Sequence, residues 1–310
     1  MLTLDHDEAI DLREQPPMEL AASDSIAVSF QPSRELYPFE SHWFHSPVGR
    51  MHYVDEGRGP PILFCHGNPT WSFLYRNVIL SLRNQFRCVA IDYPGFGLSD
   101  RPMRFGYTPQ EQTRVVVQLV NRLDLRNLVI VGHDWGGPIG VATALSDPDR
   151  IRGLAFGNTW FWPPAYSRMN LFSRFMSTSY MQKAILERNF FVEKLIPAQV
   201  VRTLSQLEMD HYRGVQATPE MRRGVAEFPR QINVARPWLA ALARGAEREL
   251  ARKPLLLTWG MRDIGAPPKY MRKWRRVFPD HRVVELPQAK HFIHEDASPE
   301  IARSIAERFG

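Results

Sequence analysis

The 310-residue sequence predicts an α/β fold in which helices cover both faces of a mostly parallel central sheet. Short apolar runs alternate with helical patterns along most of the chain, and this alternation is typical of parallel sheets. One strand-turn-helix element is centred on Asp134. A long helical stretch, rich in aromatic residues, interrupts the alternation over residues 160–248. We interpret that stretch as a helical cap inserted after the sixth strand.

The first part of the alternation consists of apolar runs of strand length. Strands are predicted over residues 41–45, 50–54, 61–65 and 86–91, with turn residues between the first two. The spacing of valine and leucine predicts a helix over residues 110–123.

Domain boundaries follow from the changes of pattern. Residues 1 to about 35 show no clean period, so we predict a surface extension or a poorly ordered tail there. The α/β core is assigned to residues 36–159 and 249–310, and the cap to residues 160–248. Further core elements are strands over 152–156, 254–259 and 283–286 and helices over 269–277 and 299–309.

The chain is organised around Asn127–Leu145, which reads NLVIVGHDWGGPIGVATAL. An apolar strand stops at Gly132, and a helix of small and aliphatic residues follows Gly136. The pattern is that of a nucleophile elbow with Asp134 in place of serine. An aspartate with a pKa of about 3.9 is ionised at neutral pH, so it can attack carbon directly and form an ester. The alternative is that Asp134 merely caps the helix.

Composition excludes several classes of function. The net charge is +6, but the basic residues are scattered and no nucleic-acid motif accompanies them, so we expect a solvated basic surface and no nucleic-acid partner. No run approaches the roughly 18 apolar residues of a membrane helix, and the N-terminus lacks the features of a signal peptide. Cys65 and Cys88 fall in predicted core strands, where buried free thiols fit a reducing, cytoplasmic location.

Neither a metal nor a cofactor is expected. No clustered cysteine and histidine motif suggests a metal site. No glycine-rich phosphate loop is evident.

An elbow of this kind requires an acid and then a histidine later in the chain, each after a strand. Asp263 lies in WGMRDIGAPP, just past a predicted strand, and could otherwise be a turn residue. His291 lies in QAKHFIHEDASPE, directly after the last predicted strand. His294 competes with it, but His291 is closer to the strand end. Asp134, Asp263 and His291 are therefore the candidate catalytic set.

Several of these motifs together resemble the haloalkane dehalogenases of the α/β-hydrolase fold. The resemblance runs from about Leu36 to the C-terminus, and the aromatic cap shares it. The motifs that carry it are HGNPTW, DYPGFGLSD, GHDWGG, WGMRD and AKHFIHED. GHDWGG also occurs in epoxide hydrolases of the same fold, so Asn68 in HGNP is the more informative residue.

The resemblance implies hydrolysis of small haloalkanes to an alcohol and a halide through an alkyl ester at Asp134. Asn68 and Trp135 would donate N–H groups to the leaving halide. Some family members place a glutamate after the sixth strand, whereas this chain has Asn158 there, so Asp263 should be the acid. This combination resembles the third dehalogenase subfamily, whose members tend to form homo-oligomers.

The candidates for an apolar substrate pocket are Phe190, Phe191, Phe228 and Pro229, each of which could equally belong to the core of the cap.

Two other functions stay open from sequence alone. An epoxide hydrolase of the same fold would need an acid for its alkoxide leaving group, and Tyr166, Tyr180 and Tyr212 lie in the predicted cap. A catalytically silent binding protein could also keep the fold. The complete nucleophile, acid and base set argues against that second alternative.

Overall fold

The computed structural model describes residues 25–164 and 168–310, and these contain one eight-stranded sheet. The strand order is β10-β9-β8-β7-β4-β5-β3-β2. The pairs β2–β3 and β3–β5 are antiparallel, and the other neighbours are parallel, which confirms the predicted mostly parallel sheet. The strands are β2 (His42–Ser46), β3 (Gly49–Glu56), β4 (Pro61–Cys65), β5 (Arg87–Ile91), β7 (Leu128–Asp134), β8 (Ile151–Thr159), β9 (Leu255–Gly260) and β10 (His281–Leu286).

Helices cover both faces of this sheet because the central strands are apolar on both sides. Along β7, Leu128 and Ile130 join one hydrophobic cluster, and Val129 and Val131 join the other. The first cluster contains apolar residues of α2, α3 and α10, and the second contains those of α1 and α12. These helices are α1 (Arg76–Leu82), α2 (Pro109–Arg122), α3 (Gly136–Ser146), α10 (Lys269–Val277) and α12 (Ser298–Phe309).

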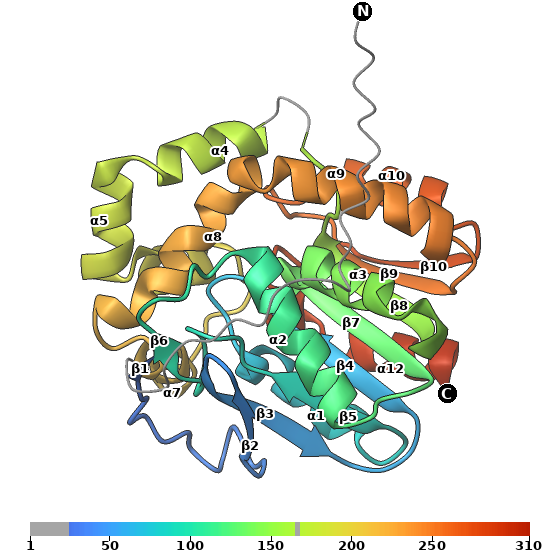
Figure 1. The fold of residues 1–310 in the computed structure, drawn as a ribbon, viewed down its shortest axis with the longest axis horizontal. Coiled ribbons are helices and arrows are strands. Elements are labelled where there is room, and N and C mark those ends of the chain that lie inside the picture. The colour runs from blue at the N-terminus through green and yellow to red at the C-terminus, as the bar shows by residue number, and fades with distance from the viewer. Residues whose placement is uncertain (1–24, 165–167) are drawn as a thin grey trace, which may run out of the picture.

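The stretch between β8 and β9 is helical, with no strand among its described residues. Figure 1 shows α4, α5 and α8 gathered at one end of the molecule, away from β10. Two short segments of this stretch are π-helical, Phe191–Leu195 and Ala246–Leu250. The α-helices are α4 (Arg168–Met176), α5 (Ser179–Arg188), α6 (Ile196–Ala198), α7 (Gln206–Gly214), α8 (Arg223–Val234) and α9 (Arg236–Gly245).

The described part of the N-terminal segment lies against the rest of the chain. The two-residue strand β1 (Ser25–Ile26) pairs antiparallel with β6 (Arg101–Pro102). The Phe30 ring meets the His211 ring edge-on at 5.5 Å between centroids. Such short pairings and single contacts have no sequence period, so pattern analysis does not predict them. Residues 1–24 of the expected extension lie outside the described residues.

Candidate active site

Close packing between β7 and α3 holds Asp134 at the carboxyl edge of the sheet. Asp134 has a φ of +52°, a left-handed conformation that is costly for a residue with a side chain. A Cβ on Gly136 would lie 1.8 Å from the carbonyl oxygen of Cys65, and one on Gly132 would lie 2.4 Å from that of Gly136. These two positions therefore require glycine, and the sharp turn presents the Asp134 carboxylate beyond the strand.

Backbone amides stabilise the Asp134 carboxylate. The Asn68 N–H donates to Oδ1 at 2.8 Å, and the backbone N–H of Trp135 also donates to this carboxylate. Burial raises the pKa of Asp134, although the nearby His291 and the two amides partly offset this effect. Two amides converging on one carboxyl group are the arrangement of an oxyanion hole.

His291 lies between the two predicted acids. Its Nδ1 is 2.8 Å from Asp263 Oδ2, and its Nε2 is 3.7 Å from Asp134 Oδ2. Burial disfavours the imidazolium, but the charge of Asp263, the hydrogen bond to it and the charge of Asp134 together raise the pKa of His291 to about 9. The structure thus brings together three residues from three different strand ends.

Asp263 is a buried carboxylate with three hydrogen-bond donors. Burial disfavours its charge, but His291, the Asn158 amide and the Gly265 N–H outweigh this effect and lower the pKa of Asp263. Asn158 Nδ2 donates to Asp263 Oδ2 at 2.7 Å, while Asn158 Oδ1 accepts from the Gly260 N–H at 2.8 Å. Sequence reasoning treated Asn158 only as a missing acid. A polar residue at the end of a buried strand was the signal for this supporting role.

The competing His294 occupies a different environment. Its ring packs against Tyr75 at 4.7 Å and against His133 at 5.3 Å, measured between centroids. Burial, together with His291, lowers the pKa of His294 to about 3. His133 Nε2 donates to the carbonyl oxygen of His291 at 2.8 Å, so this neighbouring histidine supports the loop that carries His291.

One cavity of about 370 Å³ opens onto the candidate catalytic residues. Asn68, Asp134, Trp135, Asp263 and His291 all line it. The remaining lining is mostly apolar and comes from the cap and the loops after β8, β9 and β10: Trp160, Arg168, Met169, Phe172, Phe191, Leu195, Gln199, Pro229, Ile232, Ile264, Gly265, Ala266 and Phe292. A largely apolar cavity with a few polar groups is typical of a small-molecule site.

The four candidate pocket residues occupy different places. Phe191 and Pro229 line the cavity. Phe190 and Phe228 are not among its described lining residues. Phe228 instead stacks on the Trp135 indole, with 5.3 Å between centroids and 15° between planes.

The side chains of Asn68 and Trp135 reach the cavity from two elements. Asn68 Nδ2 donates to the carbonyl oxygen of Val225 at 3.2 Å, which links the loop after β4 to helix α8. The amide has a second N–H that this bond does not use. Trp135 is held between Phe228, which stacks on it, and Trp160, which meets it edge-on at 5.2 Å.

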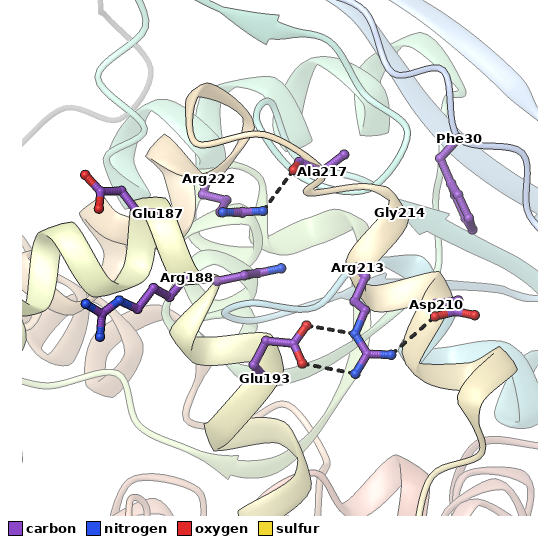
Figure 2. Close-up of a pocket in the computed structure, with 10 residues that line it drawn as sticks. Phe30, Glu187, Arg188, Glu193, Asp210, Arg213, Gly214, Ala217 and Arg222 are labelled. Carbon is purple, nitrogen blue, oxygen red and sulfur yellow. Dashed lines mark hydrogen bonds and ion pairs between the residues drawn. The ribbon is translucent and has the colours of Figure 1, made fainter.

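A second hollow, of about 490 Å³, lies on the surface of the cap (Figure 2). Three of its charged groups bind one another: Arg213 contacts Glu193 through two bonds of 2.7 and 3.0 Å and Asp210 at 3.2 Å. Arg222 donates to the Ala217 carbonyl oxygen at 2.9 Å. None of the predicted site residues lines this hollow, so we assign the chemistry to the apolar cavity.

Residues 25–164 and 168–310 also bear on metal binding, membrane insertion and disulfide formation. Over these ranges no group of three or more histidine, cysteine, aspartate or glutamate residues is arranged to hold a metal ion. No described helix combines the length and apolar character needed to cross a membrane. Cys65 and Cys88 are both free and buried.

Comparison with known proteins identifies the family of this chain. Residues 60–298 match the family model of the alpha/beta hydrolase fold. The chain is 56% identical over 286 residues to haloalkane dehalogenase 2 of Mycobacterium tuberculosis, covering 92% of this chain and 100% of that protein, and the same values hold for the protein of that name from Mycobacterium bovis. A crystal structure of the haloalkane dehalogenase DbeA from Bradyrhizobium elkani has a TM-score of 0.80 at 27% identity, covering 87% of this chain and 97% of that one.

A more distant relative shows that a shared fold alone does not define the reaction. The cis-3-alkyl-4-alkyloxetan-2-one decarboxylase of Shewanella oneidensis is 30% identical over 281 residues, covering 87% of this chain and 88% of that protein. One fold can host several reactions, so the 56% relationship over 92% of this chain decides between them. The chain belongs to the haloalkane dehalogenases of the α/β-hydrolase fold, which hydrolyse carbon–halogen bonds.

Proposed function

We propose that Asp134 is the nucleophile, His291 the general base and Asp263 the acid that orients it. The observation that supports this assignment is the position of His291, with Nδ1 on Asp263 and Nε2 3.7 Å from Asp134, at the polar end of an apolar cavity. The cavity of about 370 Å³ suits a small apolar haloalkane, and we propose no metal or cofactor.

In the first step, an Asp134 carboxylate oxygen attacks the sp³ carbon that carries the halogen. The carbon–oxygen bond forms as the carbon–halogen bond breaks, and the halide leaves with the bonding electrons. A halide is a very weak base, so no proton donor is needed. The developing negative charge is stabilised by the Trp135 indole N–H and the Asn68 amide N–H in a largely apolar cavity.

In the second step, His291 removes a proton from water, which attacks the carboxyl carbon of the Asp134 ester. The backbone N–H groups of Asn68 and Trp135 stabilise the oxyanion. When this intermediate collapses, the ester bond breaks, and the departing alkoxide takes the proton from His291 and leaves as the alcohol. The carboxylic acid that forms loses its proton to solvent, which restores the carboxylate. Ester formation removes the negative charge of Asp134, and this charge is one of the groups that raise the pKa of His291. Alkylation therefore lowers the pKa of His291, so a larger fraction of the imidazole is neutral and able to accept a proton when a base is required.

Two of the three cap tyrosines are poorly placed to act as the acid of an epoxide hydrolase. The Tyr212 hydroxyl is buried and donates to Glu295 Oε1 at 2.5 Å. Tyr180 is 69% exposed, and neither residue lines the cavity. Tyr166 lies outside the described residues. These positions favour a leaving group that needs no proton, as a halide does.

Bromide release from 1-bromobutane and 1,2-dibromoethane tests the nucleophile, with wild type and Asp134→Ala compared. We expect release by the wild type only. His291→Ala should accumulate an alkyl ester on Asp134, which intact-protein mass spectrometry detects as a mass increase. A folded wild type that releases no bromide but opens an epoxide would refute the proposal.

We also propose a location and an oligomeric state for the protein. Two buried free thiols fit a reducing, cytoplasmic environment. The resemblance to the third subfamily suggests a homo-oligomer, and light scattering after size-exclusion chromatography distinguishes it from a monomer.

A further inference from the structure

The segment that carries His291, residues 290–296, forms hydrogen bonds with residues 198–202 of the cap. Lys290 Nζ donates to the carbonyl oxygens of Ala198 and Val200 at 2.9 and 3.3 Å. The Phe292 N–H donates to the Gln199 carbonyl oxygen at 3.2 Å. Hydrogen bonds therefore flank His291 on both sides.

The same two segments remain connected further along the chain. The Val201 N–H donates to Asp296 Oδ1 at 2.8 Å. Arg202 Nε donates to the carbonyl oxygen of Glu295 at 2.8 Å, and Arg202 Nη2 lies 2.5 Å from Glu295 Oε2. Residues 198–202 and 290–296 thus form one hydrogen-bonded unit, which we call the clamp.

The Glu295 carboxylate is the centre of the clamp. Its side chain is fully buried, and a buried charge is stable only when it is paired and hydrogen-bonded. Arg76 donates to Oε1 and Oε2 at 2.6 and 2.8 Å, and the Tyr212 hydroxyl donates to Oε1. With Arg202, three donor residues fix the orientation of this carboxylate.

A second carboxylate extends the clamp into helix α7. Glu208 accepts from Arg202 at 2.6 and 2.9 Å and from Arg76 at 2.8 Å. Glu208 also closes the capping box at the start of α7 with Ser205. Two guanidinium groups and two carboxylates therefore join the cap, helix α1 and the His291 segment, with their charges balanced.

The clamp also borders the reaction cavity. Gln199 lines the cavity from the cap side, and His291 and Phe292 line it from the core side. The nucleophile Asp134 depends on none of these bonds, because the elbow between β7 and α3 holds it. The clamp can thus influence the base without moving the nucleophile.

We propose that Arg202 and Glu295 are positioning residues that hold His291 for hydrolysis of the alkyl ester. This inference rests on the proposed function of Asp134 and His291. The first step needs only the Asp134 carboxylate and the halide donors. The second step needs His291 Nε2 to face the attacking water, and displacement by about 1 Å can slow a reaction about 100-fold.

The experiment compares Arg202→Met with Arg213→Met. Both arginines belong to the stretch between β8 and β9, and their side chains are similarly exposed, 38% and 33%. Arg213 binds Glu193 and Asp210 instead of a residue of the His291 segment, so it is the matched control (Figure 2). Rapid-quench assays with 1,2-dibromoethane measure the first-turnover bromide burst, and mass spectrometry measures the lifetime of the ester.

We expect Arg202→Met to retain the wild-type burst rate but to lengthen the ester lifetime about 10-fold. Arg213→Met should match the wild type in both burst rate and ester lifetime. Loss of folded protein alone would reduce the burst amplitude without changing the ester lifetime. If Arg202→Met does not fold, Arg202→Lys keeps the charge but loses the paired donors, and its ester should live longer than that of the wild type.

Two results would overturn separate conclusions. An unchanged ester lifetime in folded Arg202→Met or Arg202→Lys, beside a normal wild-type burst, would refute the positioning role alone. The absence of any ester in the wild type and in His291→Ala would refute the proposed covalent mechanism itself.

Discussion

Asn158 Nδ2 donates a 2.7 Å hydrogen bond to Asp263 Oδ2, the same oxygen that lies 2.8 Å from His291 Nδ1. The side chain near the end of β8 therefore contacts the carboxylate that we propose as the acid. Its own carbonyl oxygen accepts from the Gly260 N–H, at the end of the strand that precedes Asp263. Asn158 thus stabilises the charge of Asp263 and positions the loop that carries this residue.

Removal of the Asn158 amide should slow ester hydrolysis about 10- to 150-fold, because a hydrogen bond to a charged group contributes about 1.5–3 kcal/mol. Asn158 has a φ of +46°, so Asn158→Gly preserves the backbone while Asn158→Ala adds strain. Single-turnover measurements should show slower hydrolysis in both variants and a normal bromide burst. Equal hydrolysis rates in Asn158→Gly and wild type would contradict the supporting role.

We expect that the acid can be moved from the loop after β9 to the end of β8. Asp263→Asn should reduce hydrolysis by about 10³–10⁴-fold, because the imidazolium loses its partner. The double variant Asn158→Glu/Asp263→Asn should recover at least part of this loss, since residue 158 already contacts the carboxylate that binds His291. Steady-state turnover measures the recovery. A double variant no faster than Asp263→Asn would show that a carboxylate at residue 158 cannot reach the imidazole.

Loss of the Trp135 indole should slow the first step rather than the second. One preorganised donor to a developing charge contributes about 10²–10³-fold, so Trp135→Phe should reduce the bromide burst rate by about that factor. Trp160 is the matched control because its indole lines the same cavity and packs against Trp135. We expect Trp160→Phe to have a smaller effect, and equal losses in the two variants would argue against a specific halide donor.

Both steps should slow as pH falls, but over different pH ranges. Alkylation needs ionised Asp134, whose pKa is raised by burial, so the burst slows as pH falls through that pKa. Hydrolysis needs neutral His291, whose pKa is about 9 while Asp134 is charged and lower in the ester. Its rate should rise with pH and level off below pH 9. Quenched-flow assays from about pH 6 to about pH 9 should show ester accumulating on the acid side. A hydrolysis rate independent of pH would exclude His291 as the base.

Adjacent phenylalanines should differ in their effect on substrate choice. Phe191 lines the cavity, whereas Phe190 is not among its described lining residues. Phe191→Leu should alter the ratio of kcat/KM for long and short bromoalkanes by about 10-fold, the effect of small changes in an apolar pocket. Phe190→Leu should leave that ratio unchanged. Equal changes in both variants would indicate that the cap as a whole, and not this side chain, shapes the cavity.

Local patterns in the sequence were sufficient to predict the α/β scaffold. The predicted strand over residues 61–65 and helix over residues 269–277 coincide with β4 and α10, because each needs only its own periodicity and end signals. The strand-turn-helix around Asp134 is equally local, since Gly132 and Gly136 permit a close approach that a Cβ would block. Such features depend on neighbours within a few residues, which is the range over which a sequence pattern carries information.

Contacts between distant residues were decided only by the tertiary structure. Asn158 meets Asp263 across 105 positions, and Arg76 meets Glu295 across 219. Phe191 reaches the cavity while Phe228 stacks behind Trp135, although both are aromatic residues in the same helical stretch. Pairing of this kind depends on which faces meet when the sheet and cap pack together, and no local propensity encodes it. The sequence therefore determined the α/β scaffold and the chemical groups of the site. Long-range packing decided their partners, their pKa values and the side chains that surround the substrate.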